Sequence, residues 1–239
     1  MSEPAESSRT PRALRPLQRS RLYEQLVERL LALVHELDLK PGDRLPPERE
    51  LASDLGVSRA SVRQALVVLE VQGLIAVRHG EGAILQESRT DAAVMSAAAA
   101  HQRRLPDVID AREALETKIA ALAAERRSDD DLARIDAALD SMAEEIGRGE
   151  RGLSGDEQFH AAVTAAARSA LLADLMGGIA AAIRESRIES LSQPDRPQVS
   201  LASHREIAAA IRAGDPEVAA LAMREHIRLV SDVALLRDT

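Results

Sequence analysis

The sequence contains no cysteine and no tryptophan, and it has only one phenylalanine and one tyrosine. Without cysteine, a disulfide framework, a thiolate zinc site and a cysteine nucleophile are all excluded. The scarcity of aromatic side chains argues against single-stranded nucleic-acid binding, because that mode stacks bases on aromatic platforms. Leucine, alanine, valine and isoleucine are therefore expected to fill the hydrophobic core.

Long apolar segments are also missing. No apolar run approaches the roughly 20 residues that a membrane span needs, and no signal-like apolar stretch stands at the N-terminus. We therefore expect a cytoplasmic protein without a membrane partner. The composition, 45% hydrophobic and 29% charged, is typical of a globular protein, and 239 residues are enough for two modest domains.

The net charge of −8 is unevenly distributed along the chain. Residues 1–90 contain 13 basic and 13 acidic groups, which leaves 18 basic and 26 acidic groups for the remainder. Five arginines without an intervening acid lie between Ser7 and Tyr23, namely Arg9, Arg12, Arg15, Arg19 and Arg21. A basic arm over residues 1–20 suits contact with phosphates, and the alternative is a solvated, disordered tail.

The pattern of residues 21–88 predicts three helices followed by a hairpin. Apolar residues recur at helical spacing over residues 22–39, and Pro47 opens a second helix that stops at Gly56. Ser58 is a suitable N-cap for a third helix over residues 58–72, and residues 74–77 and 83–86 resemble two short strands around a glycine-bearing turn. This order predicts a winged helix-turn-helix with a small β-hairpin wing.

The helix predicted over residues 58–72 has two different faces. Its packing face holds Val62, Ala65, Leu66 and Leu69 at helical spacing. Its other face carries Arg59, Ser61 and Arg63 near the N-terminal end. A helix fits the major groove, and arginine can donate two parallel bonds to guanine, worth roughly 1–3 kcal/mol of discrimination. A single arginine is more often part of a solvated helix face, so the DNA-binding interpretation depends on these residues together.

The remainder of the chain has helical periodicity. Residues 89–105 are alanine-rich, contain few large apolar side chains and precede Pro106, which predicts a partly helical linker. Residues 106–239 then predict an antiparallel six-helix bundle. The six candidate helices cover residues 107–127, 129–147, 155–167, 170–191, 197–213 and 216–236. The expected fold class is therefore mainly α, with two domains.

One carboxylate and three imidazoles form a candidate metal site in this bundle. Asp156 and His160 are four residues apart and share one helix face. His204 and His226 lie on two consecutive helices that are expected to pack antiparallel, so both imidazoles can point inward. The set suits a divalent first-row cation such as zinc, nickel or manganese. Each histidine alone is more often a surface or core-rim residue.

The N-terminal motifs resemble the DNA-binding domain of the GntR superfamily. They read "PGDRLPPERELA", "GVSRASVRQAL" and "QGLIAVRHGEG", in this order between Pro41 and Gly82. The resemblance implies a protein that binds double-stranded operator DNA. It implies DNA contacts by Arg49, Ser58, Arg59, Ser61, Arg63, His79 and Gly80.

The C-terminal motifs resemble the FCD effector domain of the FadR branch. They are "AREALE" from Ala111, "DEQFH" from Asp156 and "HREIAAAIRAGD" from His204, followed by the later His226. The resemblance implies that Asp156, His160, His204 and His226 hold a metal ion that helps to bind a small carboxylate effector. It places Arg112 near the effector, and the alternative for Arg112 is an intrahelical pair with Glu116. Six helices rather than seven favour the VanR-like subgroup.

Together these features predict a transcriptional repressor that binds DNA as a homodimer and responds to a metabolite. Two-fold symmetry is expected because one short recognition helix reads too few bases. A first alternative is a metal-dependent hydrolase or lyase with an attached DNA-binding domain, although the sequence offers no evident general base. Because no general base is evident, we do not expect an enzyme. A second alternative is a regulator that responds to the metal itself.

Overall fold

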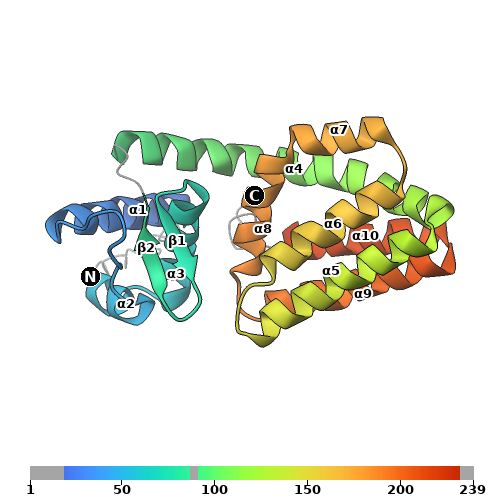
Figure 1. The fold of residues 1–239 in the computed structure, drawn as a ribbon. Helices are drawn as coiled ribbons and strands as arrows, with labels where there is room; N and C mark the ends of the chain where they lie inside the picture. Colours follow the sequence, from blue (N-terminus) through green and yellow to red (C-terminus); the bar gives the residue numbers. More distant parts are fainter. Residues whose placement is uncertain (1–18, 87–90, 232–239) are drawn as a thin grey trace, which may run out of the picture.

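The computed structural model describes residues 19–86 and 91–231. In this part of the chain a small winged domain and a larger helical domain each have their own hydrophobic core (Figure 1). The first core is built from residues 26–94 and the second from residues 119–227. The expected basic arm lies outside the described residues up to position 18.

The winged domain consists of α1 (Arg19–Glu36), α2 (Glu48–Leu55), α3 (Arg59–Val71), β1 (Ile75–Arg78) and β2 (Gly82–Leu85). The two strands pair antiparallel, with Ile75 opposite Leu85 and Arg78 opposite Gly82. The predicted winged helix-turn-helix is thus confirmed, and each strand is shifted by one residue from its expected position. The shift arises because the connecting loop is only three residues long, with Gly80 at φ +73°.

Local signals in the sequence explain where α2 and α3 begin and end. Pro47 precedes α2, and Gly56 ends it in the left-handed conformation at φ 65°. The hydroxyl of Ser58 accepts a hydrogen bond from the Ser61 amide at 3.0 Å and thereby caps α3. Local signals thus define the turn between the two helices.

A single long helix, α4 (Asp91–Arg126), connects the two domains and runs along both (Figure 1). It begins 16 residues before the helix start expected at Asp107, and it continues through Pro106. Residues 91–105, expected to be a partly helical linker, therefore belong to this helix. Alanine is the strongest helix former, so an alanine-rich segment can be helical without a wide apolar stripe.

The other helices of the described chain are α5 (Asp129–Gly147), α6 (Leu153–Ala166), α7 (Ala170–Gly178), α8 (Ala180–Leu191), α9 (Arg196–Ala213) and α10 (Pro216–Ser231). With α4 this makes seven helices in the described part of the helical domain, whereas six were expected. The difference arises at residues 170–191, which form two helices separated at Ile179. Gly177 and Gly178 precede this break, and glycine is a poor helix former.

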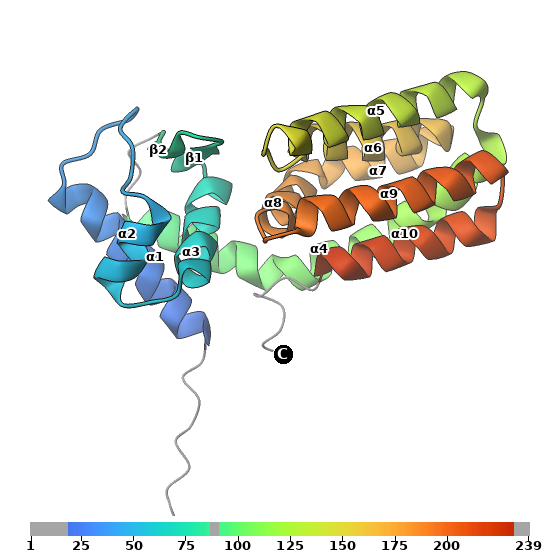
Figure 2. The ribbon, with the colours of Figure 1, turned by 90° about the horizontal axis from the view of Figure 1, so that it is seen from below.

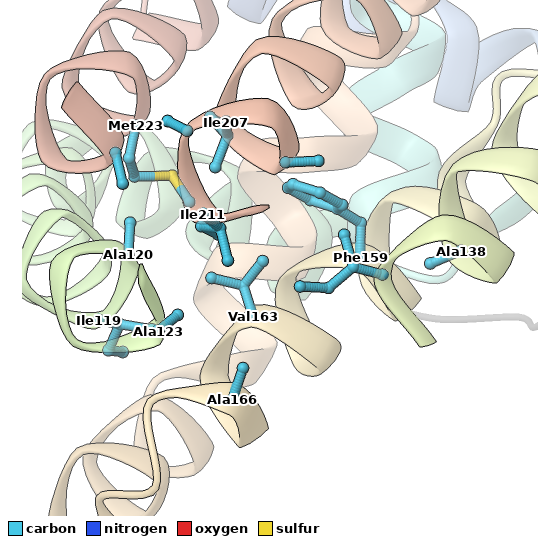
Figure 3. Close-up of a cluster of buried hydrophobic side chains, with 14 of the residues drawn as sticks. Ile119, Ala120, Ala123, Ala138, Phe159, Val163, Ala166, Ile207, Ile211 and Met223 are labelled. Carbon is cyan, nitrogen blue, oxygen red and sulfur yellow. The ribbon is translucent and has the colours of Figure 1, made fainter. Parts of the chain in front are cut away.

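Helices α4, α5, α6, α9 and α10 surround the core of the helical domain (Figures 2 and 3). Small residues allow close helix contacts, and a β-carbon added at Gly155 would lie 2.4 Å from the backbone nitrogen of Met142. This close approach of α6 to α5 places the first turns of α6, with Asp156 and His160, inside the bundle. Among the described helices, none combines the length and the apolarity that crossing a bilayer requires.

Candidate DNA-binding surface and buried imidazole cluster

The N-terminal end of α3 presents polar side chains at the surface. Arg59 and Ser58 are exposed, and Arg49 of α2 is exposed as well. The Ser58 hydroxyl lies 2.8 Å from that of Ser61, in addition to capping the helix. Arg49, Ser58 and Arg59 are thus available to a duplex.

Arg63 differs from the other arginines because it already has a partner. Its Nε and Nη2 atoms donate to the two carboxylate oxygens of Glu48, at 3.1 and 2.8 Å. The side chain is 29% exposed, so the bidentate pair holds the guanidinium at the edge of the surface. Glu48 therefore orients the guanidinium group of Arg63. In a complex with DNA, Glu48 would compete with a base for the N–H donors of this guanidinium.

The wing tip lies beside the helical domain. A β-carbon added at Gly149, between α5 and α6, would lie 2.4 Å from Cε1 of His79. Gly80 remains exposed at the tip. The seven residues predicted to contact DNA are therefore divided between an exposed group on α2 and α3 and a wing tip that touches the other domain.

Three of the predicted metal ligands meet inside the helical domain. His160 of α6, His204 of α9 and His226 of α10 are buried, and one nitrogen atom of each lies within 4.8 Å of the others. The ring of His204 stacks on Phe159, with ring centroids 4.2 Å apart. Because each histidine comes from a different helix, only the tertiary fold brings them together.

Hydrogen bonds fix which imidazole nitrogen carries the proton. The Ser203 hydroxyl donates to the Ser200 carbonyl at 2.9 Å, so it can only accept from Nδ1 of His226, 2.8 Å away. Nδ1 of His160 lies 2.5 Å from the Glu116 carboxylate, which has no proton to donate when ionised. In both histidines Nε2 therefore carries the lone pair; that of His160 has no partner, whereas that of His226 can accept from Nε2 of His204.

The separation of the nitrogen atoms fits a shared cation. Nε2 of His204 and Nε2 of His226 are 3.3 Å apart. Two nitrogens bound to one zinc-sized ion at about 2.1 Å would lie about 3.0–3.4 Å apart in octahedral or tetrahedral geometry. Nε2 of His160 is buried without a hydrogen-bond partner. These donors suit a first-row divalent ion.

Burial also keeps the imidazoles in the form that binds metals. It lowers the pKa values of His160, His204 and His226, that of His204 to about 3. Neutral imidazole has a lone pair to offer, whereas the protonated ring has none. The cluster is thus neutral near pH 7.

Asp156 lies at the edge of this cluster and completes the predicted set. One carboxylate oxygen is 3.6 Å from Nε2 of His204, and the other is 3.0 Å from Nε of Arg187. Burial alone would raise the pKa of Asp156, but the positive charge of Arg187 leads the effects that lower it. The side chain is therefore an ionised carboxylate beside the imidazoles.

Arg112 is fully buried next to the histidines. Its Nε donates to Glu116 at 2.7 Å, which is the intrahelical pair considered as an alternative. Its Nη1 donates to Ser186 at 3.3 Å, whereas Nη2 is buried without a partner. Burial opposes ionisation of Glu116, yet the charge of Arg112 and the other partners hold its pKa well below the usual value. An unpaired buried donor is costly, so Nη2 is a candidate ligand-binding atom.

Two site residues were not predicted in these roles. Glu116 orients His160, and Arg187 of α8 holds Asp156. The spacing of Arg112 and Glu116 did indicate a pair, but nothing in the sequence indicated that Glu116 also reaches a helix 44 residues later. No sequence pattern distinguished Arg187 from the neighbouring surface arginine, Arg184.

A separate groove of about 510 Å³ lies on the outer face of α4 and α10. It is lined by Asp110, Glu113, Ala114, Thr117, Lys118, Ala121, Ala220 and Arg224. None of the predicted metal ligands is among these residues, so the groove and the imidazole cluster are different features.

A winged helix-turn-helix joined to a helical domain is an architecture of DNA-binding regulators. Residues 22–85 match the family model described as bacterial regulatory proteins, gntR family, and residues 107–229 match the FCD domain. The chain belongs to the GntR family of transcriptional regulators and carries an FCD domain. It is therefore a DNA-binding transcriptional regulator, not an enzyme.

Individual relatives match over most of their length. The HTH-type transcriptional regulator LutR of Bacillus subtilis is 35% identical over 204 residues, covering 82% of this chain and 93% of the relative. The Uxu operon transcriptional regulator of Escherichia coli is 32% identical over 231 residues, covering 88% and 85%. Among solved structures, Streptococcus agalactiae GntR has 30% identity and a TM-score of 0.47, covering 87% of this chain and 98% of that one.

Proposed function

We propose that the protein is a repressor whose homodimer binds a pseudo-palindromic operator through two winged helices. The DNA contacts are assigned to Arg49, Ser58, Arg59, Ser61, Arg63, His79 and Gly80. The exposure of Arg49 and Arg59 beside the N-terminal end of α3 supports this assignment. The repressor role is supported by a relative from Cronobacter sakazakii, 28% identical over 233 residues, that is named the HTH-type transcriptional repressor NanR.

The second part of the proposal is that a divalent metal ion and a small carboxylate effector bind inside the helical domain. Asp156, His160, His204 and His226 would hold the ion, which is zinc, nickel or manganese. The observation that carries this proposal is the meeting of three buried, neutral imidazoles, with Nε2 of His160 unpaired and the Nε2 atoms of His204 and His226 3.3 Å apart. When bound, the ion supplies positive charge and an open coordination position for an oxygen ligand.

Charge balance supports an anionic effector. Two buried guanidinium groups, Arg112 and Arg187, are matched by two buried carboxylates, Glu116 and Asp156. A divalent cation would add two uncompensated positive charges in a buried place, and a bound carboxylate would offset them. The unpaired Nη2 of Arg112 is assigned to this carboxylate.

The DNA-binding assignment is tested with a duplex selected from genomic DNA by the purified wild-type protein. Arg59→Ala is expected to weaken binding about 5–150-fold at fixed salt and to relax the preference at one base position, because one base contact is worth roughly 1–3 kcal/mol. Arg127→Ala, in the helical domain, is the control and should leave binding unchanged. Unchanged affinity in both Arg59→Ala and Arg63→Ala would refute the assignment.

The effector site is tested by calorimetry on apo and metal-loaded protein with a panel of sugar acids, hydroxy acids and amino acids. Binding of a carboxylate to the metal-loaded form, lost in Arg112→Met, is the expected result. If metal alone changed DNA affinity and no acid bound, the protein would be a metal-responsive regulator instead. Metal-dependent turnover of an acid would support the hydrolase or lyase alternative.

A further inference from the structure

The two domains are joined by side-chain contacts as well as by α4. Helix α3 faces α8, and the wing faces the loop between α5 and α6 (Figure 2). We call residues 148–152 and 189–193 together the docking surface of the helical domain. Its contacts involve the recognition helix and the wing, which are the two parts of the winged domain expected to touch DNA.

Gln64 of α3 makes the first of these contacts. Its amide nitrogen donates to Glu189 of α8 at 3.1 Å, and its amide oxygen accepts from Gln193 at 2.8 Å. The other Glu189 oxygen lies 3.3 Å from Nε2 of His101 on α4. Both ends of the buried Gln64 amide are therefore hydrogen-bonded by the other domain, so separation of the two surfaces requires new partners for this amide.

Glu70 of α3 makes the second contact. One carboxylate oxygen accepts from Arg151 of the docking surface at 2.6 Å, and the other accepts from the backbone nitrogen of Val77 in β1 at 3.2 Å. Both groups of the ion pair are partly buried, at 25% and 15% exposure, so it is less screened than a surface pair. Through Glu70 this one ion pair holds both α3 and the wing.

The third contact involves the wing tip. The ring of His79 lies so close to Gly149 that a β-carbon there would clash with it. The adjacent Glu150 is acidic, and the charge of His79 contributes to lowering its pKa, after the larger effect of Arg148. His79 and Gly80 both remain exposed, so the contact places the helical domain beside the wing tip without burying it, where it would obstruct insertion of the wing into a groove.

Helix α8 connects these contacts to the buried site. Ser186 and Arg187 point toward Arg112 and Asp156. Two residues further along, Glu189 holds Gln64. The helix that contributes Ser186 and Arg187 to the buried site therefore also carries part of the docking surface, which gives a ligand at the buried site a route to that surface.

We propose that the docking surface competes with DNA for the wing and restrains the orientation of α3, so that the arrangement described here is a closed form of the protein. Release of Glu70, Gln64 and His79 from it frees the wing for the operator. The inference rests on the proposed DNA-binding role of α3 and the wing. The inference assigns Arg151 and Gln193 a role in holding the winged domain, which neither the GntR motifs nor the FCD motifs indicate.

The absence of cysteine allows a direct test. Glu70→Cys and Arg151→Cys are introduced together into the full chain and joined within one chain by a short bis-methanethiosulfonate reagent, which a reductant cleaves. Binding is measured on the duplex selected by wild-type protein. The linked form is expected to bind at least tenfold more weakly than the same sample after reduction.

A matched control links two positions within the helical domain. Asp136→Cys and Arg212→Cys replace an exposed ion pair between α5 and α9, and this link should leave DNA affinity unchanged. If the linked Glu70–Arg151 form bound within twofold of its reduced form, the closed-form inference would be overturned. If wild-type protein bound no duplex at all, the proposed function would fail and the inference with it.

A second variant tests the closed form if the variant with Glu70→Cys and Arg151→Cys does not bind the duplex even after reduction. Arg151→Ala combined with Gln193→Ala removes docking contacts without touching the residues assigned to DNA. This variant is expected to bind the selected duplex three- to tenfold more tightly than wild type, and Arg148→Ala, whose partner Glu150 lies in its own loop, should not. Equal or weaker binding by the double variant would count against the closed form.

Discussion

At the scale of single residues, the buried site depends on the positions of a few protons. Ser203 can only accept from His226 because its own hydrogen is donated to the Ser200 carbonyl. Glu116 has the same orienting effect on His160. Such partners raise the basicity of a ligating imidazole and hold its ring in place. The residues proposed to hold a metal ion are thus only part of the site.

Replacing Ser203 by alanine should therefore weaken metal binding without removing a ligand. The expected loss is about 10–100-fold in zinc affinity, measured by competition with a chelating dye, whereas His226→Ala should abolish the high-affinity site. Ser192→Ala is the matched control, because the Ser192 hydroxyl bonds to its own helix at the Ile188 carbonyl. Equal zinc affinity in Ser203→Ala and wild type would exclude the orienting role.

At the scale of helices and strands, hydrogen bonds at the helix ends fix where helices begin. The capping box at the start of α5 is an example, in which Ser128 and Asp131 satisfy each other's backbone groups. The Asp131 carboxylate accepts from the backbone nitrogen of Ser128 at 2.9 Å and from Arg168 at 2.9 Å. These bonds lower the pKa of Asp131 from 3.8 to about 2, the Ser128 backbone bond having the largest effect.

Asp131→Asn should accordingly destabilise the helical domain by about 1–2 kcal/mol at neutral pH, as measured by urea unfolding. Because the pKa of Asp131 is depressed in the folded state, its contribution is present above pH 3.8 and is lost as the pH falls toward 2. The difference between wild type and variant should shrink over this range. Asp130→Asn, at the exposed neighbouring position, is the control, and a similar loss there would contradict the capping explanation.

At the scale of the whole molecule, the central question is how two winged domains are arranged on one operator. One α3 helix offers only a few base contacts, and a symmetric pair roughly doubles the specific free energy. In the described chain the winged domain contacts the helical domain. Under the proposed closed form, each chain of the proposed homodimer has to release its winged domain before both bind one operator.

We expect two chains per duplex when the selected operator is studied by sedimentation. Deleting one half-site should reduce affinity by several orders of magnitude, because about half of the specific free energy is lost. A scrambled spacer of unchanged length serves as control and should have a smaller effect. A stable complex of one chain per operator would be incompatible with the proposed homodimer.

Much of this protein follows from the sequence alone. Ser58, Gly56 and Pro47 define the helix-turn-helix because caps and breakers act within a few residues. The spacing of Asp156 and His160, and the consecutive helices that carry His204 and His226, made a shared site possible, and the resemblance to the FCD domain favoured this set over isolated histidines. Tertiary structure was needed to extend α4 back to Asp91, because packing on both domains and alanine propensity outweigh the cost of Pro106.

Other features were decided only when distant segments met. Arg187 and Glu116 join the buried site through contacts between helices that no local pattern specifies. The contact of Gln64 with Glu189 spans 125 positions in the chain, and that of His79 with Gly149 joins a turn to a loop. Local sequence fixes caps, turns and helix faces because those interactions span a few residues. The pairing of such faces depends on the packing of the entire chain.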